Sequence, residues 1–368
     1  MKLGLHLPIN SVSFGQTSTL LLRYLYEQEK AGNSDVDWSL FPIGGVDLSS
    51  QKEDREFATW IQGKIGKTYE SFSRSTPTFK LWHLNGSFET VSNKPVLLSF
   101  YELDRPTKIE LNIARNNNIC FSSQYTCDVF KIFGVDAKFL PLAFDSYNFS
   151  RQTNRKVHTD NRIVFNLCGK FEKRKHTEKT IKAWIKKFGN NRNYVLQCAV
   201  YNPFFNEQQN HQLLAHTVNG NKPFNVTFYP MMKENVIYND FLNSSNIIIA
   251  MSGGEGWGLP EFHSVAMGKH AVCLNAHGYK SWAKPETVTF VNPSEKVDAV
   301  DGAFFKQGEP FNQGNIFNWN EDEFIAACET AVEKAKANPV NEAGLKLQEE
   351  FSKERFANSI ISLLKEQV

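Results

Sequence analysis

Long hydrophobic runs, a strong charge of one sign and an export signal are all missing from this sequence. No apolar run approaches the roughly 20 residues of a membrane-spanning helix. The formal net charge is +2 and 41% of the residues are hydrophobic, which excludes a disordered or histone-like chain. Basic and acidic residues are nearly balanced on both sides of Ser150, so neither half is a basic nucleic-acid clamp.

Cysteine pairs are also missing. The six cysteines form no CxxC pair, and most stand inside apolar runs such as VFNLCGK. This pattern favours buried thiols in a reducing compartment over zinc or redox chemistry. The first residues, MKLGLHLPIN, contain a Pro where a signal peptide needs an unbroken apolar stretch. We therefore expect a cytoplasmic protein.

What the sequence does contain is a regular alternation of short apolar strands and helices. At 368 residues the chain is long enough for two domains of about 150 residues each. The alternation runs to Phe144, lapses in a polar stretch to Asp160, and restarts with the strand RIVFNLCGK. Such alternation predicts parallel sheets with helices on both faces, so we expect two doubly wound α/β domains.

A glycine-rich loop stands between a strand and a helix at 252–260. Glycines at 253, 254, 256 and 258 are followed by Pro260 at the first helical position and Glu261 in the first turn. Glycine lets a backbone approach a ligand closely, and the free N–H groups of a helix start can hold an anion. Glu255 lies inside this loop and would face whatever binds there. A tight strand-to-helix turn without a ligand is the alternative.

The segment EGWGLPEFHSVAMGKHAV resembles the EGFGLPxxEAMAxGxPVV segment of the GT-B glycosyltransferases, in particular the retaining, glycogen-synthase-like (GT4-like) group. The resemblance implies a GT-B fold, with two Rossmann-like domains facing a central cleft. It also implies that Glu255 contacts hydroxyls of a donor sugar. The loop and helix start, Gly256, Trp257, Gly258 and Leu259, would receive the donor diphosphate.

The chain departs from this pattern at His263, where the family has a second Glu that usually holds the ribose of the nucleotide. Neutral imidazole offers one donor and one acceptor, not a bidentate carboxylate. If His263 faces the ribose, donor affinity should vary between about pH 5.5 and 7.5. Glu261 is not expected to replace it, because two positions along a helix are about 200° apart.

A second match is GKFEKRKH, which follows the strand RIVFNLC. The family pattern GRLxxxKG carries an Arg and a Lys that neutralise the diphosphate, and Lys170 and Lys175 stand at the same separation. Phosphate accepts a Lys as a point charge in place of the Arg fork. The other cations nearby, Lys173, Arg174 and Lys179, are interpreted as a solvated helix end.

Weaker candidates lie in the first domain. Gly15 and Gln16, in the loop SFGQTS after the first strand, stand where the family has a glycine-rich turn against the sugar diphosphate. His83 and Glu102 follow two later strands, and the ends of parallel strands are where α/β sheets bind ligands. We take His83 and Glu102 as catalytic candidates beside Glu255, although a single residue at a strand end is often structural.

The resemblance also bears on the domain boundaries and implies that no metal is required. We expect an acceptor-side domain at 1–148, a nucleotide-sugar domain at 149–345, and a closing helix at 346–368 that crosses back to the first domain. The fold requires no DxD metal site, and Asp35 and Asp37 are expected to be solvated. We therefore expect no metal and no cofactor apart from the nucleotide-diphosphate sugar, which is a substrate.

The leading hypothesis is a retaining transferase that moves a hexosyl or pentosyl group to an acceptor hydroxyl of a glycan or small molecule. One alternative is transfer to a hydroxymethylated DNA base, and another is a non-catalytic relative that binds nucleotide-sugars or glycans. Peripheral membrane contact would use an apolar stripe, for which core packing is the simpler explanation. The stripe comprises Phe57, Trp60, Ile61, Ile65, Tyr69 and Phe72.

Overall fold

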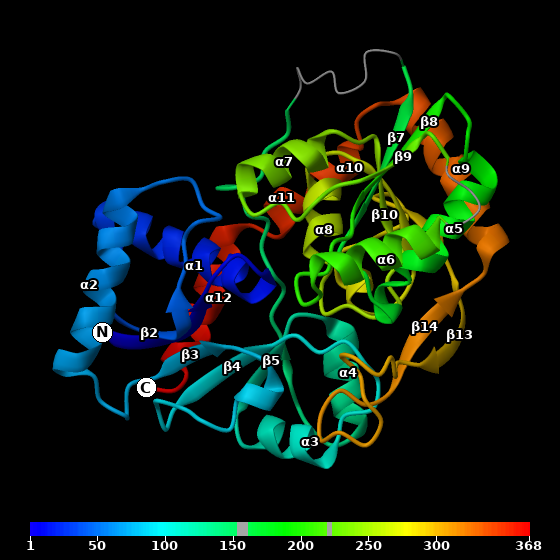
Figure 1. The fold of residues 1–368 in the computed structure, drawn as a ribbon. Helices are drawn as coiled ribbons and strands as arrows, with labels where there is room; N and C mark the ends of the chain where they lie inside the picture. Colours follow the sequence, from blue (N-terminus) through cyan, green and yellow to red (C-terminus); the bar gives the residue numbers. More distant parts are fainter. Residues whose placement is uncertain (153–160, 219–222) are drawn as a thin grey trace.

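The computed structural model describes residues 1–152, 161–218 and 223–368, and it contains two parallel six-stranded sheets (Figure 1). The first sheet has the order β2-β1-β3-β4-β5-β6 and the second β12-β11-β10-β7-β8-β9. This arrangement confirms the predicted pair of doubly wound α/β units. The predicted linker lies partly outside the described residues, at 153–160.

The strands of the first sheet are β1 (Lys2–Ile9), β2 (Asp37–Val46), β3 (Thr78–Leu81), β4 (Pro95–Ser99), β5 (Asn118–Phe121) and β6 (Lys138–Phe139). Its helices are α1 (Ser13–Lys30), α2 (Arg55–Ser71), α3 (Lys108–Arg115) and α4 (Gln124–Ile132). Phe57 and Ile61 of α2 are buried in the core, whereas Tyr69 is exposed. Most of the apolar stripe on α2 therefore packs inward.

The strands of the second sheet are β7 (Ile163–Cys168), β8 (Tyr194–Ala199), β9 (Val226–Phe228), β10 (Ile247–Ala250), β11 (His270–Leu274) and β12 (Thr289–Val291). Its helices are α5 (Thr177–Phe188), α6 (Glu207–Thr217), α7 (Asn235–Asn243), α8 (Leu259–Ala266), α9 (Glu321–Ala337), α10 (Glu342–Leu345) and α11 (Leu347–Glu350). Strand β10 is apolar and fully buried, as expected for a central strand of a parallel sheet.

The last helix, α12 (Lys353–Lys365), returns to the first sheet and packs against α1 and β3 (Figure 1). Its buried side chains, Phe356, Ile360 and Leu364, recur at helical spacing on one face. The Phe144 amide, in the segment that follows the first sheet, donates to the carbonyl of Phe351, in the segment that leads back to α12, at 2.8 Å. The two segments that connect the units are therefore hydrogen-bonded to each other.

A two-stranded antiparallel hairpin, β13 (Pro293–Asp298) and β14 (Asn315–Trp319), extends from the second unit toward α3 and α4 (Figure 1). We call residues 293–319 the strap. Lys296 pairs with Asp104 at 2.8 Å, and Glu110 of α3 accepts from the Asn312 amide at 2.9 Å. Phe305 of the strap is buried with first-unit residues such as Tyr101. The strap thus ties the second unit to the first.

All six cysteines are buried free thiols, as the sequence predicted. Across the described ranges, no helix has the length and apolar character needed to cross a membrane.

Candidate functional site

The glycine-rich loop lies against the first unit. An added Cβ at Gly254 would stand 2.7 Å from the Glu102 carbonyl oxygen, and one at Gly256 would stand 2.9 Å from Phe100 Cβ. The Ser122 hydroxyl donates to the Gly256 carbonyl at 2.9 Å. Side chains at these two positions would push the units apart, so the glycines allow the close approach. Gly258, with φ of 85°, is the N-cap of α8.

Glu255 is only 5% exposed and forms the centre of a cluster of charges. Its Oε1 pairs with the Lys175 ammonium and lies 3.5 Å from Arg174 Nη1. Burial alone would raise the pKa of Glu255, but the two cations lower the pKa to about 2. The carboxylate therefore stays ionised at neutral pH.

Arg174 was interpreted from the sequence as part of a solvated helix end, and that interpretation is wrong. Its side chain is 4% exposed and contacts three carboxylates: Glu172 at 2.6 Å, Glu102 at 3.2 Å and Glu255 at 3.5 Å. It also donates to the Gly254 carbonyl. A 3₁₀ turn at Lys173–Lys175, with the next residue at φ of 51°, turns this side chain inward.

Both neighbouring cations contact the strap, although only one of them is covered by it. Lys173 is exposed and donates to the Val300 carbonyl at 2.7 Å. Lys179 is partly buried, with its ammonium 4.0 Å from the centre of the Trp319 ring and in contact with Asn318. The interpretation as a solvated end therefore does not hold for Lys179 either, because the strap covers it.

The two lysines at the phosphate-binding spacing have different surroundings. Lys175 is mostly buried and is held by Glu255. Lys170 is about one third exposed, lies 3.7 Å from Glu172, and places its ammonium near two phenylalanine rings. Lys175 therefore lies within the Glu255 cluster, whereas Lys170 lies at its edge.

Glu102 and His83 approach this cluster from the first unit. Burial raises the pKa of Glu102, although Arg174, which pairs with its carboxylate, opposes the shift. His83 is exposed to solvent, and the protein atoms around it together with the nearby charge of Lys170 lower its pKa. The His83 ring centre is 4.3 Å from that of Phe14. At neutral pH the imidazole is uncharged and Glu102 has a cation as its partner.

Gly15 and Gln16 lie in the first turn of α1, not in a loop as expected, because the helix begins at Ser13. An added Cβ at Gly15 would stand 2.3 Å from the Asn10 carbonyl oxygen, so this glycine serves close packing. The Gln16 amide exchanges two hydrogen bonds with Asn235 of α7, at 3.1 and 2.9 Å. Gln16 therefore joins the two units in this structure.

The side chain of Trp257 belongs to the core. It is 2% exposed and packs on Phe262 and Phe351, with ring centres 5.3 Å apart in both pairs. Leu259 is partly buried against the same core. A ligand at this loop would therefore contact mainly the backbone of Trp257 and Leu259 and of the neighbouring Gly256 and Gly258.

His263 is enclosed by aromatic rings. Its imidazole stacks on Phe149 with ring centres 4.4 Å apart and meets Phe144 edge-on at 5.4 Å. Burial lowers the pKa of His263 to about 3. A group with this pKa stays neutral between about pH 5.5 and 7.5, so the enclosure of His263 argues against the expected pH dependence of donor affinity, which stays a prediction.

Glu261, in the first turn of α8, lies near the charges of Lys175 and Glu255. It is 3% exposed, and its Oε1 accepts from the Tyr279 hydroxyl at 3.3 Å. Its Oε2 has no hydrogen-bond partner within the described residues. Burial raises the pKa of Glu261 to about 7, although Lys175 opposes the shift. Glu261 and His263 contact different residues, Tyr279 and Phe149, as expected from their spacing along the helix. Of the two, Glu261 is the residue on which the charge of Lys175 acts.

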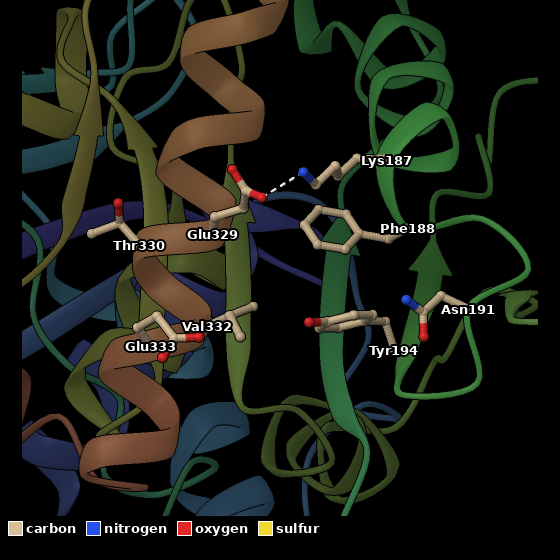
Figure 2. A pocket seen from close by; sticks show the side chains of 8 residues that line it. All are labelled: Lys187, Phe188, Asn191, Tyr194, Glu329, Thr330, Val332 and Glu333. Atoms are coloured by element: carbon tan, nitrogen blue, oxygen red, sulfur yellow. Dashed lines mark ion pairs between the residues drawn. The ribbon is translucent and has the colours of Figure 1, made fainter.

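No group of three or more His, Cys, Asp or Glu side chains suited to a metal ion occurs in the part of the chain that the structure describes. Asp37 of the DxD triplet pairs with Lys67 at 3.0 Å. Two cavities in the described part of the chain are lined by residues other than Glu255. One, of about 470 Å³, lies between α5, β8 and α9 beneath the Lys187–Glu329 ion pair (Figure 2). The other, of about 530 Å³, is lined by Glu172, Lys179 and their neighbours.

Searches of family models and of curated protein sequences find no match to this chain. Solved structures do match it. Sucrose-phosphate synthase from Thermosynechococcus elongatus superposes with a TM-score of 0.64 at 14% identity, covering 100% of this chain and 98% of that one. HepE from Anabaena in complex with UDP-glucose gives 0.64 at 12% identity, covering 100% of both chains.

A third structure, α,α-trehalose 6-phosphate synthase from Burkholderia multivorans, gives a TM-score of 0.61 at 9% identity and covers 99% of this chain and 98% of that one. These neighbours are GT-B glycosyltransferases, and the match extends over both sheets. The chain therefore has the GT-B fold, as the sequence resemblance implied.

Proposed function

We propose that this chain is a glycosyltransferase of the GT4-like group that transfers a sugar from a nucleotide-diphosphate donor to an acceptor hydroxyl with retention. The observation that carries the proposal is the buried, ionised Glu255 in a glycine loop at the contact between the two units, held by Lys175 and Arg174. The match to HepE, which was solved with UDP-glucose, supports a nucleotide-sugar donor.

The donor is assigned to residues as follows. Glu255 accepts hydrogen bonds from sugar hydroxyls, while Lys175, Lys170 and the N-terminal amides of α8 bind the diphosphate. Cations and a helix N-terminus stabilise negative charge that grows as the bond from sugar to phosphate breaks. We assign Glu261 to the ribose in place of the family's Glu, because it is close enough to Lys175 for that charge to oppose the rise of its pKa, whereas His263 is stacked on Phe149.

The reaction occurs on one face of the sugar. The bond between C1 and the phosphate oxygen breaks, the acceptor oxygen bonds to C1 from the same side, and its proton passes to the departing phosphate. Glu102, held by Arg174 at 3.2 Å, brings a carboxylate of the first unit to this cluster. No metal is assigned to the step, since the two lysines supply the positive charge.

The donor assignment is tested by titrating the protein with UDP, UDP-glucose, UDP-N-acetylglucosamine and GDP-mannose and measuring heat or thermal shift. A ligand at about 100 times its dissociation constant should add about 2.7 kcal/mol to the free energy of unfolding. Retention is tested separately, from the anomeric configuration of the transfer product by NMR. Absence of binding by every nucleotide-sugar would contradict the proposal, and an inverted product would contradict its retaining step.

A further inference from the structure

Two phenylalanine rings flank the ammonium of Lys170, and a third packs on one of them. The ammonium lies 5.1 Å from the ring centre of Phe204 and 5.0 Å from that of Phe304. Phe204 and Phe304 meet edge-on at 5.7 Å, and Phe205 stacks on Phe304 at 5.9 Å. Two of these residues come from the loop between β8 and α6, whereas Phe304 comes from the strap. Two segments far apart in the sequence therefore form one aromatic surface.

Core packing accounts for Phe304 in part, because it packs against the cluster that contains Tyr101 and Phe305, but it does not account for Phe204. Phe204 is 67% exposed, and Phe304 is only partly buried. An exposed Phe forgoes most of the free energy that burial would contribute, about 25 cal/mol per Å² of apolar surface. Aromatic rings beside a polar group are a common feature of small-molecule sites.

The strap places this surface next to the Glu255 cluster. Phe305, the residue after Phe304, lies 5.9 Å below the guanidinium of Arg174, which contacts Glu255. Phe304 and Phe305, which are consecutive in the strap, thus contact Lys170 and Arg174, which both belong to the segment 169–176. From the first unit, His83 is close enough to Lys170 for that charge to lower its pKa. The aromatic surface therefore borders the site where transfer is proposed.

The position of Lys170 limits what the rings can hold. In a nucleotide the ribose separates the base from the diphosphate, so a diphosphate on Lys170 does not bring its base to rings about 5 Å from the same ammonium. The donor sugar is assigned to Glu255. The remaining group that must approach the phosphate is the acceptor, because one-face transfer brings its hydroxyl to the side of the leaving phosphate.

We propose that Phe204 and Phe304 form an acceptor subsite for a pyranose ring on the second unit, in addition to the contacts expected from the acceptor-side domain at 1–148 and with Lys170 at its inner edge; this proposal rests on the proposed function. The C–H groups on one face of a pyranose carry small positive charges. The negative face of an aromatic ring attracts such charges as it attracts a cation. The strap contacts with Asp104 and Glu110 hold Phe304 in place, so the subsite depends on the contact between the two units.

The experiment measures binding of methyl glycosides of glucose, galactose, mannose and N-acetylglucosamine by saturation-transfer NMR, in the presence of UDP. It compares the wild type with Phe204→Ala, Phe304→Ala and Phe204→Trp. Phe88→Ala is the matched control, because Phe88 is 66% exposed in the first unit. Circular dichroism and UDP titration establish that each variant is folded.

At least one pyranoside should bind the wild type and lose between about threefold and tenfold in affinity in both alanine variants. Phe204→Trp and the control should retain that affinity, and UDP affinity should be unchanged in all of them. Absence of pyranoside binding, unchanged affinity in the alanine variants, or loss of UDP affinity instead would overturn the acceptor subsite. If the wild type fails to bind UDP, the proposed function fails independently of this subsite.

Discussion

The guanidinium Nη1 of Arg174 lies 3.5 Å from Oε1 of Glu255, and it also contacts Glu102 of the first unit at 3.2 Å. One buried cation therefore joins a carboxylate of the glycine loop to a carboxylate across the contact between the units. Arg174 and Glu255 are withdrawn from bulk water and depend on each other to stay charged, whereas Glu102 is partly exposed. This relationship makes Arg174 the residue through which the fold and the candidate site are coupled.

We expect Arg174→Ala to lower the free energy of unfolding by about 3 to 5 kcal/mol, because it leaves buried carboxylates without their cation. Chemical denaturation measures the loss. Lys173→Ala is the control, since Lys173 is the residue before Arg174 and its side chain is exposed. Equal stability of the two variants would show that Arg174 does not hold these carboxylates.

Lys175→Ala should weaken UDP binding by about 1.5 to 3 kcal/mol and leave uridine binding almost unchanged, because a charge-assisted hydrogen bond to the diphosphate is lost. Lys170→Ala should act in the same direction. Lys187→Ala, which removes an exposed lysine of the distant cavity in Figure 2, serves as the control. Isothermal titration would contradict the assignment if UDP and uridine lost equal affinity.

Much of the fold could be predicted from the alternation of strands and helices, because fully buried strands such as β10 are continuous apolar runs. The position of the strap could not be predicted, since it depends on contacts with Asp104 and Glu110, which are far away in the sequence. Arg174 was missed for a related reason. A 3₁₀ turn, not a solvated helix end, sets its direction, and a run of basic residues does not distinguish the two.

At the glycine loop, the motif predicted where Glu255 lies but not what surrounds α8. The position of His263 in the family pattern suggested a ribose contact, whereas the structure places this imidazole against Phe149. No signal in the sequence reports that Phe149, in the segment between the sheets, packs there. The buried state of Glu261 likewise depends on Tyr279, which a later segment supplies.

Gly254→Ala should destabilise the contact between the units, because its Cβ would stand 2.7 Å from the Glu102 carbonyl oxygen. Thermal unfolding should show a lower midpoint and UDP affinity should fall. Gly63→Ala in α2, where an added Cβ meets nothing within 4 Å, should instead raise stability by up to about 1 kcal/mol. A Gly254→Ala protein as stable as Gly63→Ala would contradict the close approach.

Stability between about pH 4.5 and pH 7 should report on Glu261. Its folded pKa of about 7 exceeds the ordinary value of 4.5, so in this window the folded state retains a proton that the unfolded state has released. Stability should therefore fall as pH rises through the window. Glu261→Gln should flatten this part of the profile, measured by urea denaturation at each pH. An identical slope in the variant would place the titration elsewhere.

His263→Phe should bind UDP with the wild-type pH profile between pH 5.5 and 7.5, since an imidazole with a pKa of about 3 does not titrate there. The substitution keeps an aromatic ring against Phe149. A wild-type affinity that varies with pH in a way the variant lacks would return His263 to the nucleotide site and contradict the assignment of Glu261.

The proposed contact of Glu255 with the sugar in the transition state is tested most directly by the turnover of Glu255→Gln. Donor and acceptor are the pair identified by titration, and circular dichroism shows that the variant is folded. We predict that turnover falls by about two orders of magnitude, or about 3 kcal/mol, while UDP affinity stays near that of the wild type. Unchanged turnover in a folded Glu255→Gln protein would contradict it.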